Sequence, residues 1–175
     1  MKKITRFIVA GFFFLICTNS FAATRANTTT FALGAGYEFF ASKRNIQNAT
    51  LPLALLGYNF TERCGIEALL GVINTTSHQS DTYGEHVHGG IVLVDGIYHF
   101  SSYRAIEPFV LAGVGVTGLD PNGTDARNEG NINAGAGLQW FVSDKVSLRV
   151  EARDLYTLVG GKNDVLLDGM VVFTF

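Results

Sequence analysis

The last eleven residues of the chain, 165–175, show the pattern that recurs along its length. Counted back in steps of two from Phe175, every residue on one face is apolar or glycine, whereas the other face carries Asp168 and Thr174. A period of two with one apolar face is typical of a β-strand. The pattern also suits a strand that faces lipid and ends at an aromatic girdle.

Seven further segments show the same alternation. The clearest is 131–140, where one face holds Ile132, Ala134, Ala136, Leu138 and Trp140 and the other holds only Asn, Gly and Gln. A length of about ten residues is that of a tilted strand that crosses a bilayer. The predicted strands cover about 31–40, 49–60, 64–73, 86–100, 107–118, 131–140, 146–153 and 165–175.

The connections alternate between short and long. Residues 61–63 and 143–145 are tight polar turns, whereas 74–85 and 119–129 are long polar loops. Short turns on the side of the termini and longer loops on the other side follow the rule for outer-membrane barrels. Backbone groups in hydrocarbon must all be paired, so such a sheet has to close on itself. An even number of antiparallel strands permits that closure.

Charged residues lie opposite the apolar faces, which decides the interpretation. A soluble barrel with a dry core would carry its charges outside. We therefore predict an all-β fold, an eight-stranded antiparallel up-and-down transmembrane β-barrel with a charged interior and aromatic belts near its strand ends. The predicted charge network of the lumen comprises Glu38, Glu67, Asp95, Arg149, Glu151, Arg153 and Asp168.

Ionisable groups in a narrow lumen are costly unless they are paired. Arg149 and Arg153 are expected to bridge Glu151 and carboxylates of neighbouring strands, first of all Asp168. Two interpretations remain open: a salt-bridged plug, or a narrow cation-preferring pore. The plug is favoured because an interior of eight strands is just wide enough for its own side chains.

The amino terminus carries an export signal. Lys2, Lys3 and Arg6 precede a short apolar run at 7–17, and the small residues Ser20 and Ala22 follow. This pattern predicts a signal peptide at 1–22, a short tail at 23–30 and the barrel at 31–175. The mature chain would carry 10 basic and 15 acidic residues, which excludes a basic footprint for nucleic acid. It would keep one cysteine, Cys64, and so form no internal disulfide.

Two stretches carry a resemblance to a known family. The sequence NAGAGLQWFVSDKVSLRVEAR at 133–153, preceded by EPFVLAGVG at 107–115, resembles the small OmpA-like and opacity-protein-like β-barrels of Gram-negative outer membranes. The resemblance implies a location among outer-membrane lipids and lipopolysaccharide. It also implies insertion by the barrel assembly machinery, which would read Phe173 and Phe175 as an assembly signal. Because the chain stops at Phe175, we expect no domain that grips the cell wall.

Two candidate chemistries compete with a purely structural role. His99, Ser101 and Glu107 resemble the His, Ser and Glu of lipid A deacylases, which are also eight-stranded barrels. The predicted strand order places these three residues at the periplasmic end of the barrel, however, whereas the deacylases act on the outer leaflet. In the loop at 74–85 and just after it, the residue types suit a transition metal; they are His78, Asp81, Glu85, His86 and His88.

We therefore expect a monomeric outer-membrane barrel without cofactor, metal or catalytic site, with a structural or surface-exposed role. The loops at 42–48, 74–85 and 119–129 are candidates for contact with a host surface, as in opacity-like adhesins. A narrow porin and a lipid A modifying enzyme are the alternatives.

Overall fold

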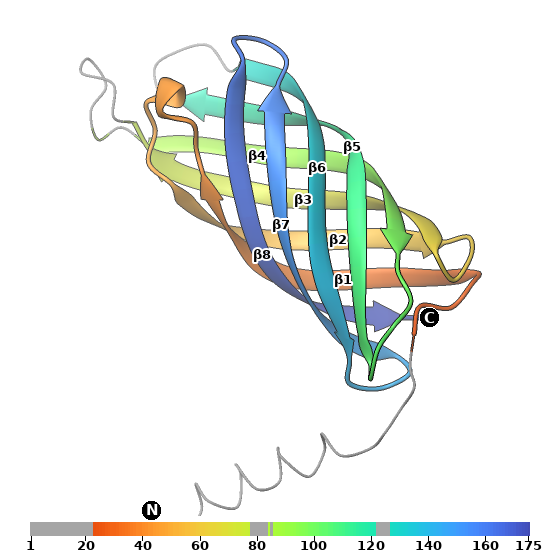
Figure 1. Cartoon of the computed structure of the whole chain (residues 1–175). Coiled ribbons are helices and arrows are strands. Elements are labelled where there is room, and N and C mark those ends of the chain that lie inside the picture. Colours follow the sequence, from red (N-terminus) through yellow and green to blue (C-terminus); the bar gives the residue numbers. More distant parts are fainter. Residues whose placement is uncertain (1–22, 78–83, 85, 122–126) are drawn as a thin grey trace, which may run out of the picture.

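The computed structural model describes residues 23–77, 84, 86–121 and 127–175, and these form a closed antiparallel barrel (Figure 1). Each strand pairs with its neighbours in sequence, and β1 pairs with β8 to close the sheet. The prediction of an eight-stranded up-and-down barrel is confirmed. The strands are β1 (Thr28–Phe39), β2 (Ala49–Asn59), β3 (Cys64–Thr76), β4 (His86–His99), β5 (Ile106–Pro121), β6 (Arg127–Phe141), β7 (Val146–Thr157) and β8 (Lys162–Thr174).

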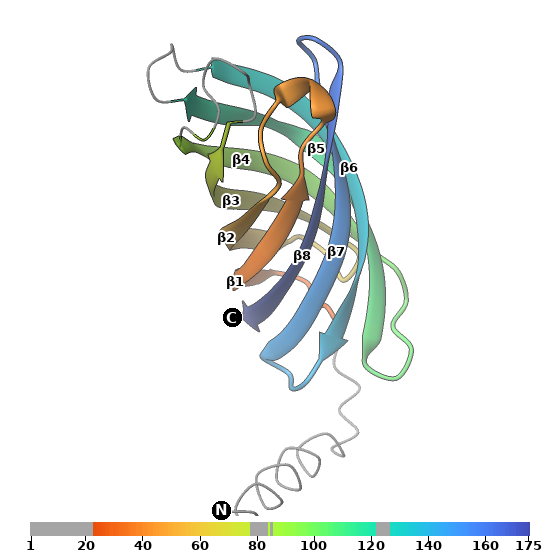
Figure 2. The ribbon, with the colours of Figure 1, turned by 90° about the vertical axis from the view of Figure 1, so that its left-hand side faces the viewer.

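The two ends of the barrel differ. β1 begins beside the end of β8, with Thr30 opposite Thr174, so we call this side the terminal end and the other side the loop end (Figure 2). A short 3-10 helix, η2 (Ser42–Arg44), lies in the β1–β2 connection at the loop end. Among the residues that the structure describes, no helix is long and apolar enough to cross a bilayer.

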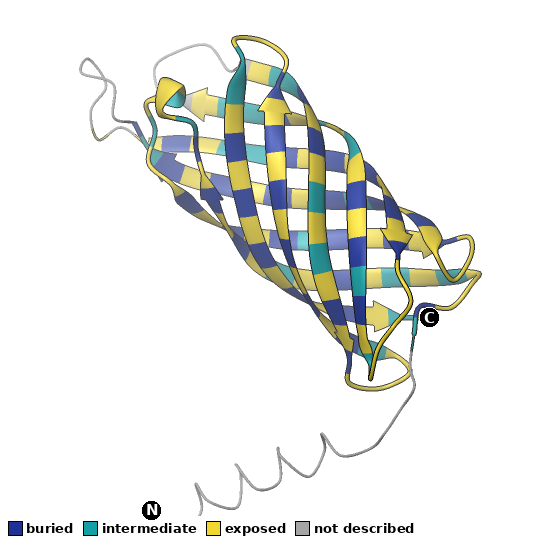
Figure 3. Ribbon diagram, in the orientation of Figure 1, coloured by how far each residue is buried: buried dark blue, intermediate teal, exposed yellow. Residues whose placement is uncertain are grey.

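The wall shows the predicted alternation of exposed and buried residues, visible as bands along each strand in Figure 3. On β7, Arg149 points inward and is 3% exposed, whereas its neighbour Val150 points outward and is 56% exposed. Successive side chains of a strand point to opposite faces, so one strand presents charge to the lumen and an apolar stripe to the outside. The outward face is apolar around the barrel.

The strands at the loop end are longer than the sequence suggested. β5 and β6 stay paired as far as Leu119 opposite Arg127, so the prediction of a loop over 119–129 was wrong at both of its ends. Asp120 and Pro121, expected in a turn, still belong to β5. At the terminal end, the connection at 101–106 is tightened by pairing of Tyr103 with Ile106, around Arg104 and Ala105 at φ 49° and 69°. Two residues in succession at positive φ form the mirror-image turn that suits a hairpin.

The interior also holds a large apolar part, which the prediction of a charged lumen did not include. Leu51, Leu53 and Leu55 of β2 all point inward and join a buried apolar cluster with residues of β1, β3, β4, β7 and β8. On β2 both faces are apolar, so the period of two that separates inside from outside disappears there. An eight-stranded interior must be filled by side chains, and here leucines fill much of it.

Little free space remains inside. A cavity of about 20 Å³ lies toward the terminal end, lined among others by Thr24, His99 and Arg149. That volume accommodates about one water molecule.

Candidate functional site

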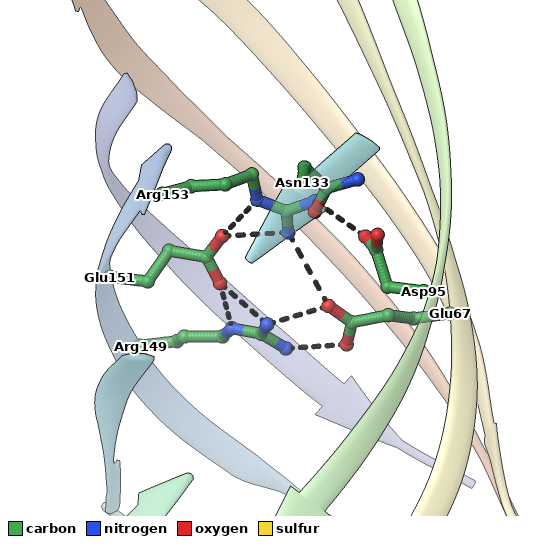
Figure 4. A network of polar contacts seen from close by, with 6 residues as sticks. All are labelled: Glu67, Asp95, Asn133, Arg149, Glu151 and Arg153. Carbon is green, nitrogen blue, oxygen red and sulfur yellow. Dashed lines mark hydrogen bonds and ion pairs between the residues drawn. The ribbon is translucent and has the colours of Figure 1, made fainter. Parts of the chain in front are cut away.

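The central ion-pair network starts from three residues of one strand. Arg149, Glu151 and Arg153 alternate on β7, so all three point into the lumen (Figure 4). The Glu151 carboxylate lies between the two guanidinium groups: it accepts a hydrogen bond from Arg149 Nε on one oxygen and from Arg153 Nε on the other, both at 2.9 Å. The strand thus carries its own alternating charge ladder.

The two arginines also reach across the barrel. Arg149 donates two parallel hydrogen bonds, at 2.8 and 2.7 Å, to the carboxylate of Glu67 on β3. Arg153 donates to Asp95 on β4 and, at 3.4 Å, to Asn133 on β6. Strands β3 and β4 are not neighbours of β7 in the sheet, so these pairs cross the lumen and tie its opposite walls together (Figure 4).

An aromatic ring supports this network. The Arg149 guanidinium lies over Phe109 of β5, 4.2 Å from the ring centroid, in a cation–π contact. A Cβ atom at Gly137 of β6 would collide with the Phe109 ring. The glycine-rich inward face of β6 therefore leaves the room in which Phe109 and the arginine stack.

Asp168 does not take the part expected of it. We predicted it as the first partner of the arginines, but neither of its oxygens accepts a hydrogen bond from any residue that the structure describes. It lies directly opposite Glu151 across the β7–β8 pair, so two carboxylates stand side by side. The arginines instead reach across to Glu67 and Asp95. Glu38 of β1, fully buried, likewise lacks a hydrogen-bond partner among the described residues.

A second cluster, which the sequence did not reveal, lies at the loop end. Arg44 of η2 turns into the barrel mouth, where its side chain is 2% exposed. Its Nε donates to Asp164 of β8 at 2.8 Å, and its two terminal nitrogens donate to Glu129 of β6 at 2.7 Å and to Thr157 of β7 at 2.8 Å. We call these four residues the mouth clasp.

The charge of Arg44 is secure in this position. Burial acts to lower the pKa of its guanidinium, but the hydrogen bonds and negative charges of Asp164 and Glu129 outweigh that effect and raise the pKa above its ordinary value. The sequence predicts residues 42–48 only as a loop available for contact with a host surface, and not as the source of an inward cation. The one sequence signal for a cationic partner was the position of Asp164, which lies two residues before Leu166 and so points inward on the same face of β8.

A third polar cluster closes the terminal end. His99 Nδ1 lies 2.8 Å from a Glu107 oxygen, and both side chains are buried. The Thr24 hydroxyl also donates to Glu107, so the start of the described chain packs into the lumen. Ser101, the expected third member of a lipid A deacylase-like trio, is exposed in the β4–β5 turn and has no contact with this pair among the hydrogen bonds of the described residues.

The histidines suggested as metal ligands do not form a complete site. His86 and His88 stack on the outward face of β4, with ring centroids 6.3 Å apart, and His88 Nδ1 lies 2.7 Å from Asn74 Oδ1. The other candidates, His78, Asp81 and Glu85, lie outside the described residues. Within the described ranges, no three His, Cys, Asp or Glu side chains are grouped to hold a metal ion.

The end of the chain contributes to closure of the barrel. Phe173 points outward, and Phe175 is 77% exposed, while its backbone N–H and C=O pair with Thr29 at 2.9 and 3.1 Å. The use of these phenylalanines as an assembly signal stays a prediction. So does the signal peptide at 1–22, which lies outside the described residues.

A closed sheet with an apolar exterior, aromatic residues near the strand ends and ion pairs inside defines the class of outer-membrane β-barrels. The chain belongs to the OprF membrane-domain family, whose model matches residues 3–173. The expected resemblance to OmpA-like barrels and the location in the outer membrane of a Gram-negative bacterium are thereby confirmed. In this class the short turns face the periplasm, so the terminal end is the periplasmic side and the loop end the outer side.

Two curated relatives support the assignment. Outer membrane porin F of Pseudomonas aeruginosa is 26% identical over 144 residues, covering 80% of this chain and 41% of that protein. Outer membrane protein Omp38 of Acinetobacter baumannii is 28% identical over 158 residues, covering 77% of this chain and 44% of that protein. The chain thus spans less than half the length of these relatives.

Solved structures agree with the fold. The N-terminal β-barrel domain of P. aeruginosa OprF superposes with a TM-score of 0.63 at 21% identity, covering 86% of this chain and 98% of that one. Ail, the attachment invasion locus protein of Yersinia pestis, was solved with the heparin analogue sucrose octasulfate. It superposes with a TM-score of 0.61 at 12% identity, covering 86% and 99%. These likenesses concern the fold alone.

Proposed function

We propose that this protein is a structural, surface-exposed component of the outer membrane whose lumen is held shut by its own ion pairs. The observation that carries the proposal is the bidentate pair between Arg149 and Glu67, which joins opposite walls across the barrel. Buried pairs of this kind are worth most when every charge has several hydrogen bonds, as both arginines have here. The closed sheet leaves no edge strand to pair with a second chain, which supports a monomer.

Recording of purified protein in planar bilayers tests the closed lumen. Because ion pairs join opposite walls across the lumen, we expect no steady conductance above that of the bare membrane. A large porin reconstituted in the same membranes is the positive control. Steady cation-selective steps would contradict the proposal.

The second candidate function is a narrow cation-preferring pore. It is favoured by the excess of carboxylates inside: Glu38 and Asp168 have no hydrogen-bond partner among the described residues, and the central arginines are already engaged by other acids. Free carboxylates along a lumen attract cations. The same recordings distinguish this function from the plug, since selectivity for cations is its required result.

Contact with a host surface is the finer form of the surface-exposed role. Leu158 and Val159, at the tip of the β7–β8 connection on the outer side, are 61% and 68% exposed. Exposed apolar side chains at a loop tip suit contact with a partner, and Ail, which shares the fold, is by name an attachment protein.

Exchange of Leu158 and Val159 for Asn tests this role without touching the lumen. We expect the double variant, displayed on a bacterium that lacks other adhesins, to bind cultured host cells several-fold less than the unchanged protein, by loss of apolar contact area. A Thr174→Ser variant at the periplasmic end is the control. Equal binding by all three proteins would contradict an adhesive role of Leu158 and Val159 and would leave only the structural role.

A further inference from the structure

The geometry points to Arg44 as a separate lock on the outer mouth: release of this one side chain admits water and small solutes to the outer part of the lumen, above the central network. The mouth clasp differs from the central network in origin, because its arginine comes from a connection and not from the wall. A connection can move without breaking the barrel sheet, whereas Arg149 and Arg153 are fixed to β7.

Arg44 is held by three strands at once. Its partners Glu129, Thr157 and Asp164 belong to β6, β7 and β8, and they lie 85 to 120 residues away in sequence. The backbone of the connection is fastened to the same point, because Ala41 N donates to Asp164 Oδ1 at 2.8 Å. The left-handed Asn45, at φ 52°, then turns the chain back toward β2. One folded connection therefore covers the side of the mouth formed by β6 to β8.

The clasp and the central network occupy different levels of the lumen. Along β7, the inward residues run from Thr157 of the clasp through Leu155 to Arg153 of the network. Along β8 they run from Asp164 through Leu166 to Asp168. Leu155 and Leu166 are buried, and no hydrogen bond joins the two clusters among the described residues. Breaking the lower cluster therefore leaves the upper one closed.

Release of Arg44 would also change the charge of the mouth. Asp164, Glu129 and the partnerless Glu38 are all acidic, and Lys162, which pairs with Glu129, would be the remaining cation of this group. Burial of ionised carboxylates without a cation is costly, and a cleft lined by acidic groups raises the local concentration of cations. The opened mouth would thus favour entry of small cations.

Cysteine labelling below the clasp tests the assignment. In a Cys64→Ala background, Leu155→Cys places a thiol just beneath the mouth clasp. A small, positively charged methanethiosulfonate reagent is then added to the folded barrel in detergent. Arg44→Gln is expected to raise the rate of modification at least about tenfold, which corresponds to the loss of one hydrogen bond to a charged group.

The neighbouring lysine supplies the matched control. Lys43 lies on the same η2 and loses the same charge in Lys43→Gln, but it is exposed and contacts only the Gly161 carbonyl, at 3.4 Å, among the hydrogen bonds of the described residues. Its rate should equal that of the parent. Arg25→Gln, which removes the exposed ion pair with Asp144 at the periplasmic end, should also leave the rate within about twofold of the parent.

Three results would overturn the assignment: no change in Arg44→Gln, an equal rise in Lys43→Gln, or an equal rise in Arg25→Gln. Folding of every variant is checked by the heat-dependent shift in gel mobility. If Arg44→Gln does not fold, Arg44→Lys and Glu129→Gln each remove part of the clasp, and each must raise the rate above that of Lys43→Gln. This experiment is independent of the conductance of the unchanged protein, so its failure would leave the closed-lumen proposal standing.

Discussion

Replacement of Arg149 by alanine is expected to lower the free energy of unfolding by about 3–5 kcal/mol. The guanidinium binds Glu67 across the lumen and Glu151 on its own strand, so its removal leaves Glu67 without its main cation and Glu151 with Arg153 alone. The loss comes chiefly from those stranded charges and not from the attraction itself. Urea unfolding in lipid vesicles, followed by the heat-dependent shift in gel mobility, measures the change.

An exposed ion pair provides the matched comparison. Arg25 pairs with Asp144 at 3.3 Å, but both side chains are more than half exposed. Arg25→Ala is therefore expected to cost no more than about 1 kcal/mol. Arg149→Lys keeps the charge but loses the planar fork, and should recover only part of the loss. If Arg149→Ala were as mild as Arg25→Ala, the central network would not hold the barrel together.

The outward face of the same strand gives the second large effect. Val150→Arg is expected to destabilise the barrel in a bilayer by about 2–4 kcal/mol, because it places a charge near the middle of the lipid-facing surface. Arg149 is tolerated one residue away because it points inward to carboxylates. Comparison of positions 149 and 150 therefore tests whether the barrel is charged inside and apolar outside. Vesicle unfolding with urea again gives the difference.

Depth in the membrane supplies the control. Tyr156 also points outward from β7, but it lies near the outer end of the strand. Tyr156→Arg should cost only about 0–1 kcal/mol, since a charge near the interface reaches water. A neutral Val150→Arg would mean that this face does not meet hydrocarbon.

The lumen is organised as three polar clusters separated by apolar side chains. The mouth clasp lies at the outer end, the ion pairs of β7 with β3 and β4 lie in the middle, and Glu107 with His99 and Thr24 lies at the periplasmic end. The first two clusters join strands that are distant in sequence, and the third joins the segment before β1 to β4 and β5. Backbone hydrogen bonds hold the strands of the wall together, and these side-chain contacts add links across the lumen.

Successive side chains of a strand point to opposite faces whatever the strand pairs with. The sequence alone therefore determined the strands that form the wall of the barrel. Wherever one face was apolar and the other polar, as on β6, β7 and β8, the inward and outward sets could be read directly. On β2, where leucines occupy both faces, the pattern lost its contrast, and the apolar half of the lumen was missed.

Closure of the sheet decided what the pattern could not. Which carboxylates meet Arg149 and Arg153 depends on which strands stand opposite β7, and the answer, β3 and β4, excluded the adjacent Asp168. Arg44 shows the same limit, because residues 42–48 carry no periodicity and its acidic partners lie 85 and 120 residues further along. The local sequence determined which face of a strand is apolar. Only closure of the barrel brought charges that are distant in sequence within hydrogen-bonding distance of one another.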